Sequence, residues 1–322
     1  MSNPKSVSER ILLLVRDMVG DLVNTTGAVR RLRDHLPEAT FVIEGGAAAC
    51  ELFPDMEVWV RKRHGGLRGK IARVLAIRKR RFDRALILDD SRDKIRIAVL
   101  AGIPQVIGVA RNRAPIRGAK ILAFDANGHD LFDPLRSILR DLGVEGDVAP
   151  HLPISQSHRD RAYELMAEGK VILHVGSSDL AKSWPTRHWV ELAQAPGDAC
   201  VVAAGPGEEA LRDTIAERAG VASLPTMKLL DYAAVIERAR AVVTADTSAA
   251  HIAGAVGTRS IVLYGPTRPS RFAPWQLSTP LWHDLGCDHY GSGCAHRQEG
   301  KCPQTCMKSV TVDEVRIALK SP

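Results

Sequence analysis

The chain has 322 residues, of which 45% are hydrophobic and 25% are charged, and its formal net charge is +7. This composition excludes a disordered chain and a disulfide-stapled miniprotein, and the length predicts two domains of ordinary size. The most apolar window, residues 97–110, is broken by Gly102 and Pro104, and residues 1–10 lack the apolar core of a signal peptide, so we expect a soluble cytoplasmic protein without a membrane span.

Apolar runs typical of buried parallel strands alternate with amphipathic stretches along the whole chain, which predicts the α/β class. In the first half the predicted strands are Ile11–Val15, Thr40–Ile43, Ala85–Leu88 and Gln105–Val109. In the second half they are Val171–Val175, Ala199–Ala203, Ala241–Ala245 and Ser260–Tyr264. Residues 147–160 lack periodicity and are predicted to link two Rossmann-like domains, 1–150 and 151–322. We expect these domains to face a ligand cleft at the carboxyl ends of their strands.

Two carboxylates, Asp17 and Asp21, follow the first predicted strand, where a helix is predicted to run to about Leu36. A carboxylate at the carboxyl end of a first parallel strand can serve as a general base. A plain helix cap is the alternative role for either residue.

The net charge is concentrated in one segment of the first half. Residues 61–84 hold eleven basic residues and one acid, a charge of +10, so the rest of the chain carries −3. Ile71, Val74, Leu75 and Ile77 give this segment an apolar side at helical spacing, which predicts an amphipathic helix with a basic face. Such a face is either a solvated surface or a contact for an anionic partner.

The fifth predicted strand leads into a loop containing Gly176, Ser177, Ser178 and Lys182, before a helix predicted to start near Pro185. Glycine permits close approach of the backbone to a ligand, and hydroxyls with a mobile cation suit phosphate oxygens. The loop is neither a Walker loop nor a GxGxxG motif.

The seventh predicted strand ends at Asp246, which is predicted to cap a short helix that Gly257 closes. Thr247, Ser248 and His251 flank the start of that helix. A helix N-terminus offers free N–H groups and the positive end of the dipole, which favours a phosphate or diphosphate. The alternative is that Asp246 and Ser248 only cap the helix and that His251 packs in the core.

Four of the six cysteines gather near the end of the chain, namely Cys287, Cys294, Cys302 and Cys306. In a reducing compartment such clustering favours a metal over disulfides, and four thiolates suit tetrahedral Zn²⁺ or Fe. The spacing lacks the paired CxxC of zinc knuckles, so a structural Fe or Zn site and a metal-free segment both stay open. Cys50 and Cys200 are predicted to be buried thiols, and residues 309–319 a closing helix.

Three of these segments resemble glycosyltransferase family 9, the ADP-heptose:lipopolysaccharide heptosyltransferases, in matching order across nearly the whole chain. The family's N-terminal pattern is seen in Gly20 and Asp21 through Leu32–Pro37. Its two later patterns are seen in His174–Pro185 and in Asp246–Thr267. The last two together are specific.

The resemblance implies a GT-B architecture, with the nucleotide sugar held mainly by the C-terminal domain. It assigns the catalytic base to Asp21 rather than to Asp17. The donor contacts it implies are Ser177, Ser178, Lys182, Met227, Asp246, Thr247, Ser248 and His251. A ribose contact falls on Glu208 or Glu209. Ser248 stands where many relatives have Gly, and Gly27 replaces a common Pro.

The activity that the resemblance implies is inverting transfer of a heptose from ADP-heptose to a saccharide acceptor of the lipopolysaccharide-core type, with no cofactor required. Relatives meet an acidic, phosphorylated sugar with basic residues of about this region, so Arg61, Arg63 and Arg80 are predicted to bind an anionic glycan acceptor. The inner face of the cytoplasmic membrane is a second partner for this patch. Alternatives are another nucleotide sugar, or a protein or small-molecule acceptor. A nucleic-acid-binding protein is the rival of another class, disfavoured by the single patch and by only 5% aromatic residues.

Overall fold

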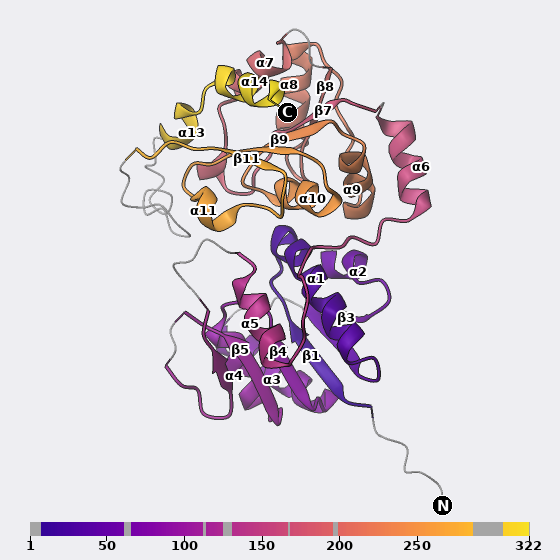
Figure 1. Cartoon of the computed structure of the whole chain (residues 1–322), viewed down its shortest axis with the longest axis vertical. Helices are drawn as coiled ribbons and strands as arrows, with labels where there is room; N and C mark the ends of the chain where they lie inside the picture. Colours follow the sequence, from indigo (N-terminus) through magenta and orange to yellow (C-terminus); the bar gives the residue numbers. More distant parts are fainter. Residues whose placement is uncertain are drawn as a thin grey trace, which may run out of the picture. The chain divides into compact units, whose positions relative to one another are not determined.

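The computed structural model describes residues 8–60, 66–111, 114–124, 131–166, 168–195, 199–285 and 305–321. The chain divides into two compact units, residues 1–150 and 151–322. Each unit is an open parallel sheet with helices packed against it (Figure 1). None of the helices in the described ranges combines the length and the apolar character that crossing a bilayer requires.

The first unit is built on a six-stranded sheet with the order β3-β2-β1-β4-β5-β6, in which all pairings are parallel. Its strands are β1 (Arg10–Leu14), β2 (Thr40–Gly45), β3 (Glu57–Val60), β4 (Arg84–Ile87), β5 (Gln105–Val109) and β6 (Lys120–Leu122). The central strand β1 is a run of buried aliphatic residues because it is covered on both faces.

In the described part of this unit the helices are α1 (Val19–His35), α2 (Ala48–Leu52), α3 (Gly66–Arg80), α4 (Arg92–Leu100) and α5 (Asp133–Asp141). Helices α3 and α4 share one core with the sheet, in which Ile77 and Ile95 pack among Leu12 and Ile87. Helix α1 contacts α2 and α5. Gly27 of α1 is needed there, since a Cβ would stand 2.3 Å from the carbonyl oxygen of Val148.

The second unit is built on a five-stranded parallel sheet with the order β11-β10-β9-β7-β8. Its strands are β7 (Val171–His174), β8 (Cys200–Ala203), β9 (Ala241–Ala245), β10 (Ser260–Leu263) and β11 (Ser278–Leu281). Its helices are α6 (Gln156–Leu165), the 3₁₀ turn η1 (Leu180–Lys182), α7 (Thr186–Ala193), α8 (Glu209–Ala219), α9 (Leu229–Glu237), α10 (Ser248–Val256), α11 (Pro269–Phe272), α13 (Thr305–Ser309) and α14 (Val312–Lys320).

Two tryptophans anchor the end of the chain in the core of the second unit. Trp184 and Trp189 are buried and meet edge to face, with ring centroids 4.8 Å apart. The Trp184 indole N–H donates to the carbonyl oxygen of Val310, just before α14, at 2.9 Å. A capping box at Thr311 starts α14. This packing fixes the position of the loop that precedes Trp184 along the chain.

All eight predicted strands are present, with ends shifted by at most two residues. The three strands that were not predicted, β3, β6 and β11, each lie at the edge of a sheet. They have only three or four residues and no buried apolar run, and β11 contains Pro280, which an edge strand tolerates. The predicted linker 147–160 is wrong from Gln156 onward, because Ser155 caps α6 in a capping box.

Two further predictions about burial are wrong. The helix predicted in the basic segment is α3, but Ile71 and Leu75 of its predicted apolar side are exposed, and only Ile77 is buried. Cys50, in the short helix α2, is exposed, and Cys200 is only half-buried, packing against the core of the second unit.

Candidate active site

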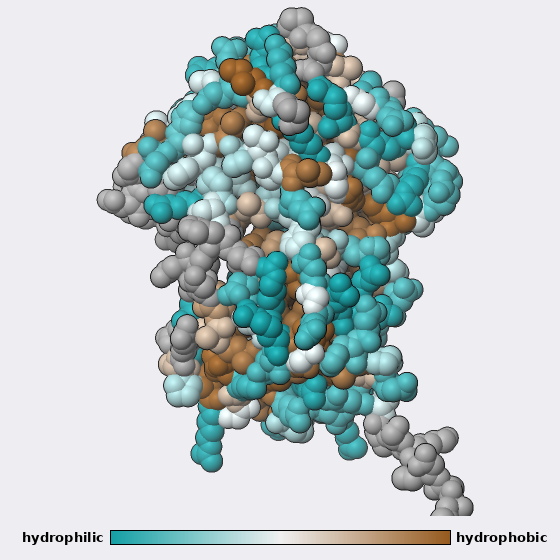
Figure 2. Space-filling model, viewed as in Figure 1, coloured by the Kyte–Doolittle hydropathy of each residue, from teal (hydrophilic) through white to brown (hydrophobic). Residues whose placement is uncertain are grey.

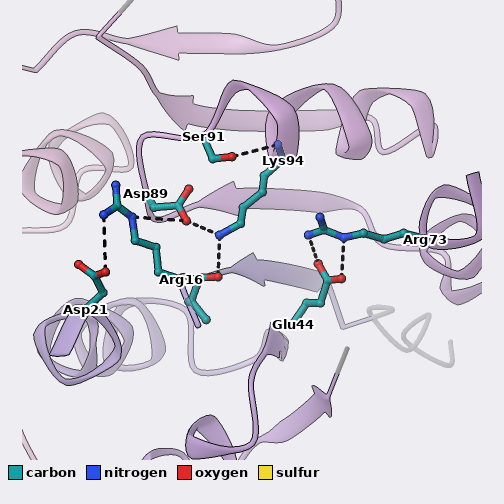
Figure 3. Close-up of polar contacts among 8 residues, drawn as sticks. Arg16, Asp21, Glu44, Arg73, Asp89, Ser91 and Lys94 are labelled. Carbon is teal, nitrogen blue, oxygen red and sulfur yellow. Dashed lines mark hydrogen bonds and ion pairs between the residues drawn. The ribbon is translucent and has the colours of Figure 1, made fainter. Parts of the chain in front are cut away.

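The first unit gathers charged side chains at the carboxyl ends of β1 and β4 (Figure 3). Asp21 lies in the first turn of α1, and Met18 holds the N-cap position without a side-chain cap bond. Asp21 Oδ2 lies 3.5 Å from Arg16 Nη1, and 29% of the Asp21 side chain is exposed. An accessible carboxylate at this edge of the sheet can accept a proton from a bound hydroxyl.

Arg16 lies between Asp21 and a second carboxylate, Asp89, with its Nε 4.0 Å from Asp89 Oδ2 (Figure 3). Asp89 is buried, and Lys94 donates both to its carboxylate and, at 2.7 Å, to the carbonyl oxygen of Val15. Burial raises the pKa of the Asp89 carboxyl above its ordinary value, although Lys94 and Arg16 act in the opposite direction. These contacts position Arg16 beside Asp21.

Asp17, the other candidate base, has a different environment. Its Oδ1 is buried, and a Cβ on Gly46 would stand only 3.7 Å from that atom. The Asp21 carboxylate is partly exposed beside the Arg16 guanidinium. Asp17 is partly exposed as a residue too, so its one buried oxygen is the difference that favours Asp21 as the group that meets a substrate.

The basic segment is partly neutralised by acids of its own unit. Arg73 reaches inward and makes two hydrogen bonds to the buried carboxylate of Glu44, one of them 2.7 Å long (Figure 3). Arg80 pairs with Glu57 at 2.6 Å and lies over the Trp59 ring. Arg80, one of the predicted acceptor residues, is thus held at the sheet edge by β3. The other two, Arg61 and Arg63, lie outside the described residues.

In the second unit, the loop after β7 is shaped by its own side chains. The Ser177 hydroxyl donates to the Asp179 carbonyl oxygen and accepts from the Asp179 N–H. The Asp179 carboxylate in turn accepts from the Ala181 N–H and caps η1. Ser178 is exposed. Ser178 is therefore the serine whose hydroxyl faces solvent, while that of Ser177 shapes the turn.

Lys182 and Asp246 join this loop to the loop before α10. Lys182 Nζ donates to Asp246 Oδ2 at 2.7 Å and to the Asp246 carbonyl oxygen at 3.1 Å. Asp246 is therefore not the predicted helix cap, since Thr247 occupies that position and makes no side-chain cap bond. The hydroxyls of Thr247 and Thr244 bond to each other at 2.9 Å instead. The first N–H groups of α10 consequently have no side-chain cap, which suits an anion.

Other predicted donor residues surround this helix start. Ser248 is half-buried at the first position of α10, and His251 is buried one turn further on. Thr267, which follows β10, is also buried, and its hydroxyl has no hydrogen-bond partner in the part of the chain that the structure describes. A buried polar atom without a partner is costly, so Thr267 is a further candidate for a ligand contact that the sequence did not single out.

A glycine cradle after β7 and β8 holds the carboxylate of Glu208. Glu208 Oε2 accepts from the Gly205 N–H at 3.1 Å, and a Cβ on Gly176 would stand 1.7 Å from the same oxygen. Glu209 instead accepts from the Thr226 hydroxyl at 2.9 Å. Of the two glutamates that the sequence left open, Glu208 lies at the carboxyl ends of the strands. Met227, next to Thr226, is half-buried.

A buried polar pair lies beneath this site. His174 Nδ1 is 2.7 Å from the Tyr232 hydroxyl, and the two rings are 5.6 Å apart. Burial lowers the pKa of His174 to about 4 and raises that of Tyr232. His174 is therefore neutral near pH 7 and packs β7 against α9.

Of the four cysteines predicted to bind a metal, only Cys306 lies among the described residues. Cys287, Cys294 and Cys302 lie outside the described residues, and Cys306 is half-buried and packs near Gly265. Within the described ranges, no group of three His, Cys, Asp or Glu side chains is placed to hold a metal ion. The metal site stays a prediction that these residues do not support.

Two separate arrangements thus emerge, one in each unit. The first unit carries an accessible carboxylate held near a cation. The second carries an uncapped helix start, a lysine and a carboxylate in a glycine cradle. The carboxylate of the first unit suits proton abstraction. The arrangement in the second unit suits a molecule with phosphate and hydroxyl groups, such as a nucleotide.

Comparison with known proteins gives a consistent picture. A family model described as glycosyltransferase family 9 (heptosyltransferase) matches residues 70–289. Lipopolysaccharide heptosyltransferase 1 of Escherichia coli is 36% identical over 107 residues, which are 32% of this chain and only 33% of that protein. Lipopolysaccharide heptosyltransferase 2 of the same organism is 24% identical over 305 residues, which are 85% of this chain and 86% of that protein.

The solved structure of the E. coli ADP-heptose lps heptosyltransferase II matches with a TM-score of 0.72 at 20% identity, covering 96% of this chain and 98% of that chain. At this identity the likeness shows the fold. The predicted GT-B architecture, with two parallel α/β units, is confirmed.

Proposed function

Since the chain belongs to glycosyltransferase family 9, the heptosyltransferases, we propose that this enzyme transfers a heptose from ADP-heptose to a saccharide acceptor of the lipopolysaccharide-core type. The names of the relatives support this donor and this pathway, since they include lipopolysaccharide heptosyltransferases and an ADP-heptose enzyme. No cofactor takes part in the proposed transfer.

One observation carries the proposal: the uncapped start of α10 lies beside Lys182, whose Nζ is 2.7 Å from Asp246. A diphosphate bound there meets backbone N–H groups, the positive end of the helix dipole and a lysine cation. The donor diphosphate replaces the Asp246 carboxylate as the partner of Lys182. Thr247, Ser248 and His251 complete the diphosphate site, with the Ser178 hydroxyl at its other side and Ser177 holding the turn that presents it.

The nucleoside part of the donor is assigned to the neighbouring loops. Glu208 accepts hydrogen bonds from the ribose hydroxyls, because its carboxylate is held at the strand ends by Gly205. Met227 packs against adenine, which suits its half-buried, polarisable side chain.

The transfer itself is a single displacement. Asp21 accepts the proton of the acceptor hydroxyl while that oxygen forms a bond to the anomeric carbon. The bond from the anomeric carbon to the diphosphate oxygen breaks on the opposite side, so the configuration inverts. ADP leaves with added negative charge on its terminal phosphate, which Lys182 and the α10 N–H groups stabilise. Arg16, whose Nη1 lies 3.5 Å from Asp21 Oδ2, orients that carboxylate.

The acceptor is an anionic glycan. Arg61 and Arg63 contact its acidic groups, and Arg80, although paired with Glu57, remains partly exposed for a third contact. The first unit is accordingly the acceptor side and the second unit the donor side.

A thermal-shift series with ADP, UDP and GDP at equal concentration tests the donor. A ligand at 100 times its dissociation constant stabilises a protein by about 2.7 kcal/mol, so ADP is expected to raise the melting temperature well above the other two. A larger shift with UDP or GDP would reject ADP-heptose as the donor and leave the family membership intact.

A further inference from the structure

The outward side of α3 carries three aliphatic side chains in a line. Leu67, Ile71 and Leu75 are spaced four residues apart and are 74%, 51% and 55% exposed. Residues four apart lie one above the other along a helix, so these three form a continuous apolar row, here called the α3 stripe. Most of the surface seen in Figure 2 is hydrophilic, with hydrophobic residues in small groups.

The contacts on the inner side of α3 fix which side of the helix faces outward. Ile77 is fully buried in the core of the first unit. Arg73 reaches inward to Glu44, whose carboxylate is buried, and makes two hydrogen bonds to it. Rotating α3 to bury the stripe would expose Ile77 and leave the Glu44 carboxylate buried without its cation, which is strongly unfavourable.

Cations border the stripe on the same exposed side. Arg68 and Lys79 are exposed, and neither has an acidic partner among the residues that the structure describes, whereas Lys70 pairs with Asp93. At the end of the stripe, the Arg78 guanidinium donates to the Leu100 carbonyl oxygen at 2.6 Å.

Leu100, at the end of the neighbouring helix α4, is itself 61% exposed. The surface of α3 therefore combines a narrow apolar row with cations that no acid of the described chain neutralises.

We propose that the α3 stripe, with Arg68, Arg78 and Lys79, docks the protein on an anionic membrane surface. A helix with an aliphatic row bordered by Lys and Arg lies in the plane of the interface, where the aliphatic side chains enter the acyl boundary and the cations meet anionic headgroups. A row one side chain wide is too small for a stable protein interface, whereas a bilayer accepts it without a shaped counterpart. The inference does not depend on the proposed function, because vesicle binding needs neither donor nor acceptor.

Co-sedimentation of the full chain with phospholipid vesicles tests this proposal. Vesicles of phosphatidylcholine with about one third phosphatidylglycerol are compared with pure phosphatidylcholine vesicles. The wild type is expected to bind the anionic vesicles at least tenfold more strongly. The triple variant Leu67→Ser, Ile71→Ser, Leu75→Ser is expected to lose at least tenfold of that binding, and Arg68→Glu with Lys79→Glu to lose the preference for anionic lipid.

The matched control removes exposed aliphatic side chains from the second unit, by Leu277→Ser and Ile317→Ser, which are 56% and 67% exposed in the wild type. This control is expected to bind like the wild type. Absence of wild-type binding, or equal loss in the control and the stripe variant, would overturn the proposal. Sedimentation velocity provides a further test. If the wild type is a dimer and the stripe variant a monomer, the proposal is also overturned, because the stripe would then be an interface between copies.

A second readout covers the case in which the triple variant folds poorly. Ile71→Trp keeps the stripe apolar and places an indole at its centre. Brominated lipids in the anionic vesicles are expected to quench this added fluorescence more strongly than that of the wild type. Of the five wild-type tryptophans, Trp184 and Trp189 are buried and the other three are half-buried. Equal quenching in the two proteins would contradict insertion of the stripe.

Discussion

Lys182 Nζ donates to Asp246 Oδ2 at 2.7 Å and to the Asp246 carbonyl oxygen at 3.1 Å, which ties together two loops that are 64 residues apart in the chain. If a diphosphate takes the place of Asp246, removing the lysine cation weakens nucleotide binding. Lys182→Met is expected to raise the ADP dissociation constant by about 10- to 100-fold, since a charge-assisted bond contributes about 1.5–3 kcal/mol. Isothermal titration with ADP measures this change. An unaltered dissociation constant would place the diphosphate elsewhere.

Gly176 and Glu208 offer a double-mutant test of the ribose contact. A Cβ at Gly176 would stand 1.7 Å from Glu208 Oε2, so Gly176→Ala must displace that carboxylate. Gly176→Ala and Glu208→Ala are each expected to weaken ADP binding about tenfold, and the double variant to be no weaker than either one. Glu209→Ala is the control, because Glu209 is bonded to Thr226, and is expected to bind ADP normally. Additive losses would show that the two sites act separately.

The ion pair between Arg73 and Glu44 is predicted to stabilise the first unit, and this can be tested without measuring activity. The Arg73 and Glu44 side chains are 13% and 1% exposed, so Arg73→Met leaves a buried carboxylate without its cation. We expect a loss of about 3 kcal/mol in the free energy of unfolding of the first unit, and partial recovery in the double variant with Glu44→Met.

The matched control is Lys70→Met, which removes the exposed pair with Asp93 and is expected to cost about 1 kcal/mol or less. Urea unfolding followed by circular dichroism gives these values. Equal effects of Arg73→Met and Lys70→Met would contradict the structural role of the buried pair.

His174 makes the second unit sensitive to acid. Burial lowers its pKa in the folded protein to about 4, below the ordinary value of 6.5. Between these two values the unfolded chain binds a proton that the folded chain does not, so the free energy of unfolding falls as the pH drops through this window.

The expected contribution of His174 is about 3 kcal/mol between pH 6.5 and pH 4. His174→Gln is expected to flatten this part of the pH profile of urea unfolding, whereas His35→Gln, at an exposed position of α1, is expected to leave it unchanged. An unflattened profile in His174→Gln would assign the acid sensitivity to other groups.

The strands could be predicted from the sequence because a buried parallel strand is a local apolar run, as in Ile11–Leu14. The loop after β7 and the turn before α10 could also be located, since glycine and hydroxyl residues at strand ends are local signals. The partner of Lys182 could not be predicted from the sequence. The local sequence around Asp246 predicts a helix cap, and its ion pair with Lys182 forms only through a tertiary contact.

The orientation of α3 shows the same limit. Helical periodicity identified an apolar side that includes Ile71 and Leu75, but periodicity cannot tell which side meets the core. Glu44, which is buried on strand β2, determines which side of α3 faces the core, because it binds Arg73. The signal for Asp89 was present in the sequence, since this carboxylate follows a predicted strand, as Asp21 follows the first.

The central claim is that Asp21 is the base of a heptosyl transfer. The most direct measurement incubates wild-type protein and Asp21→Asn with ADP-heptose and a heptose-free lipopolysaccharide-core acceptor, and follows the acceptor by mass spectrometry together with ADP release. The wild type is expected to add one heptosyl residue for each ADP released. Asp21→Asn is expected to lose about 10²- to 10⁴-fold in kcat while binding ADP normally. Near wild-type turnover in Asp21→Asn, or no transfer by a wild type that binds ADP, would contradict the claim.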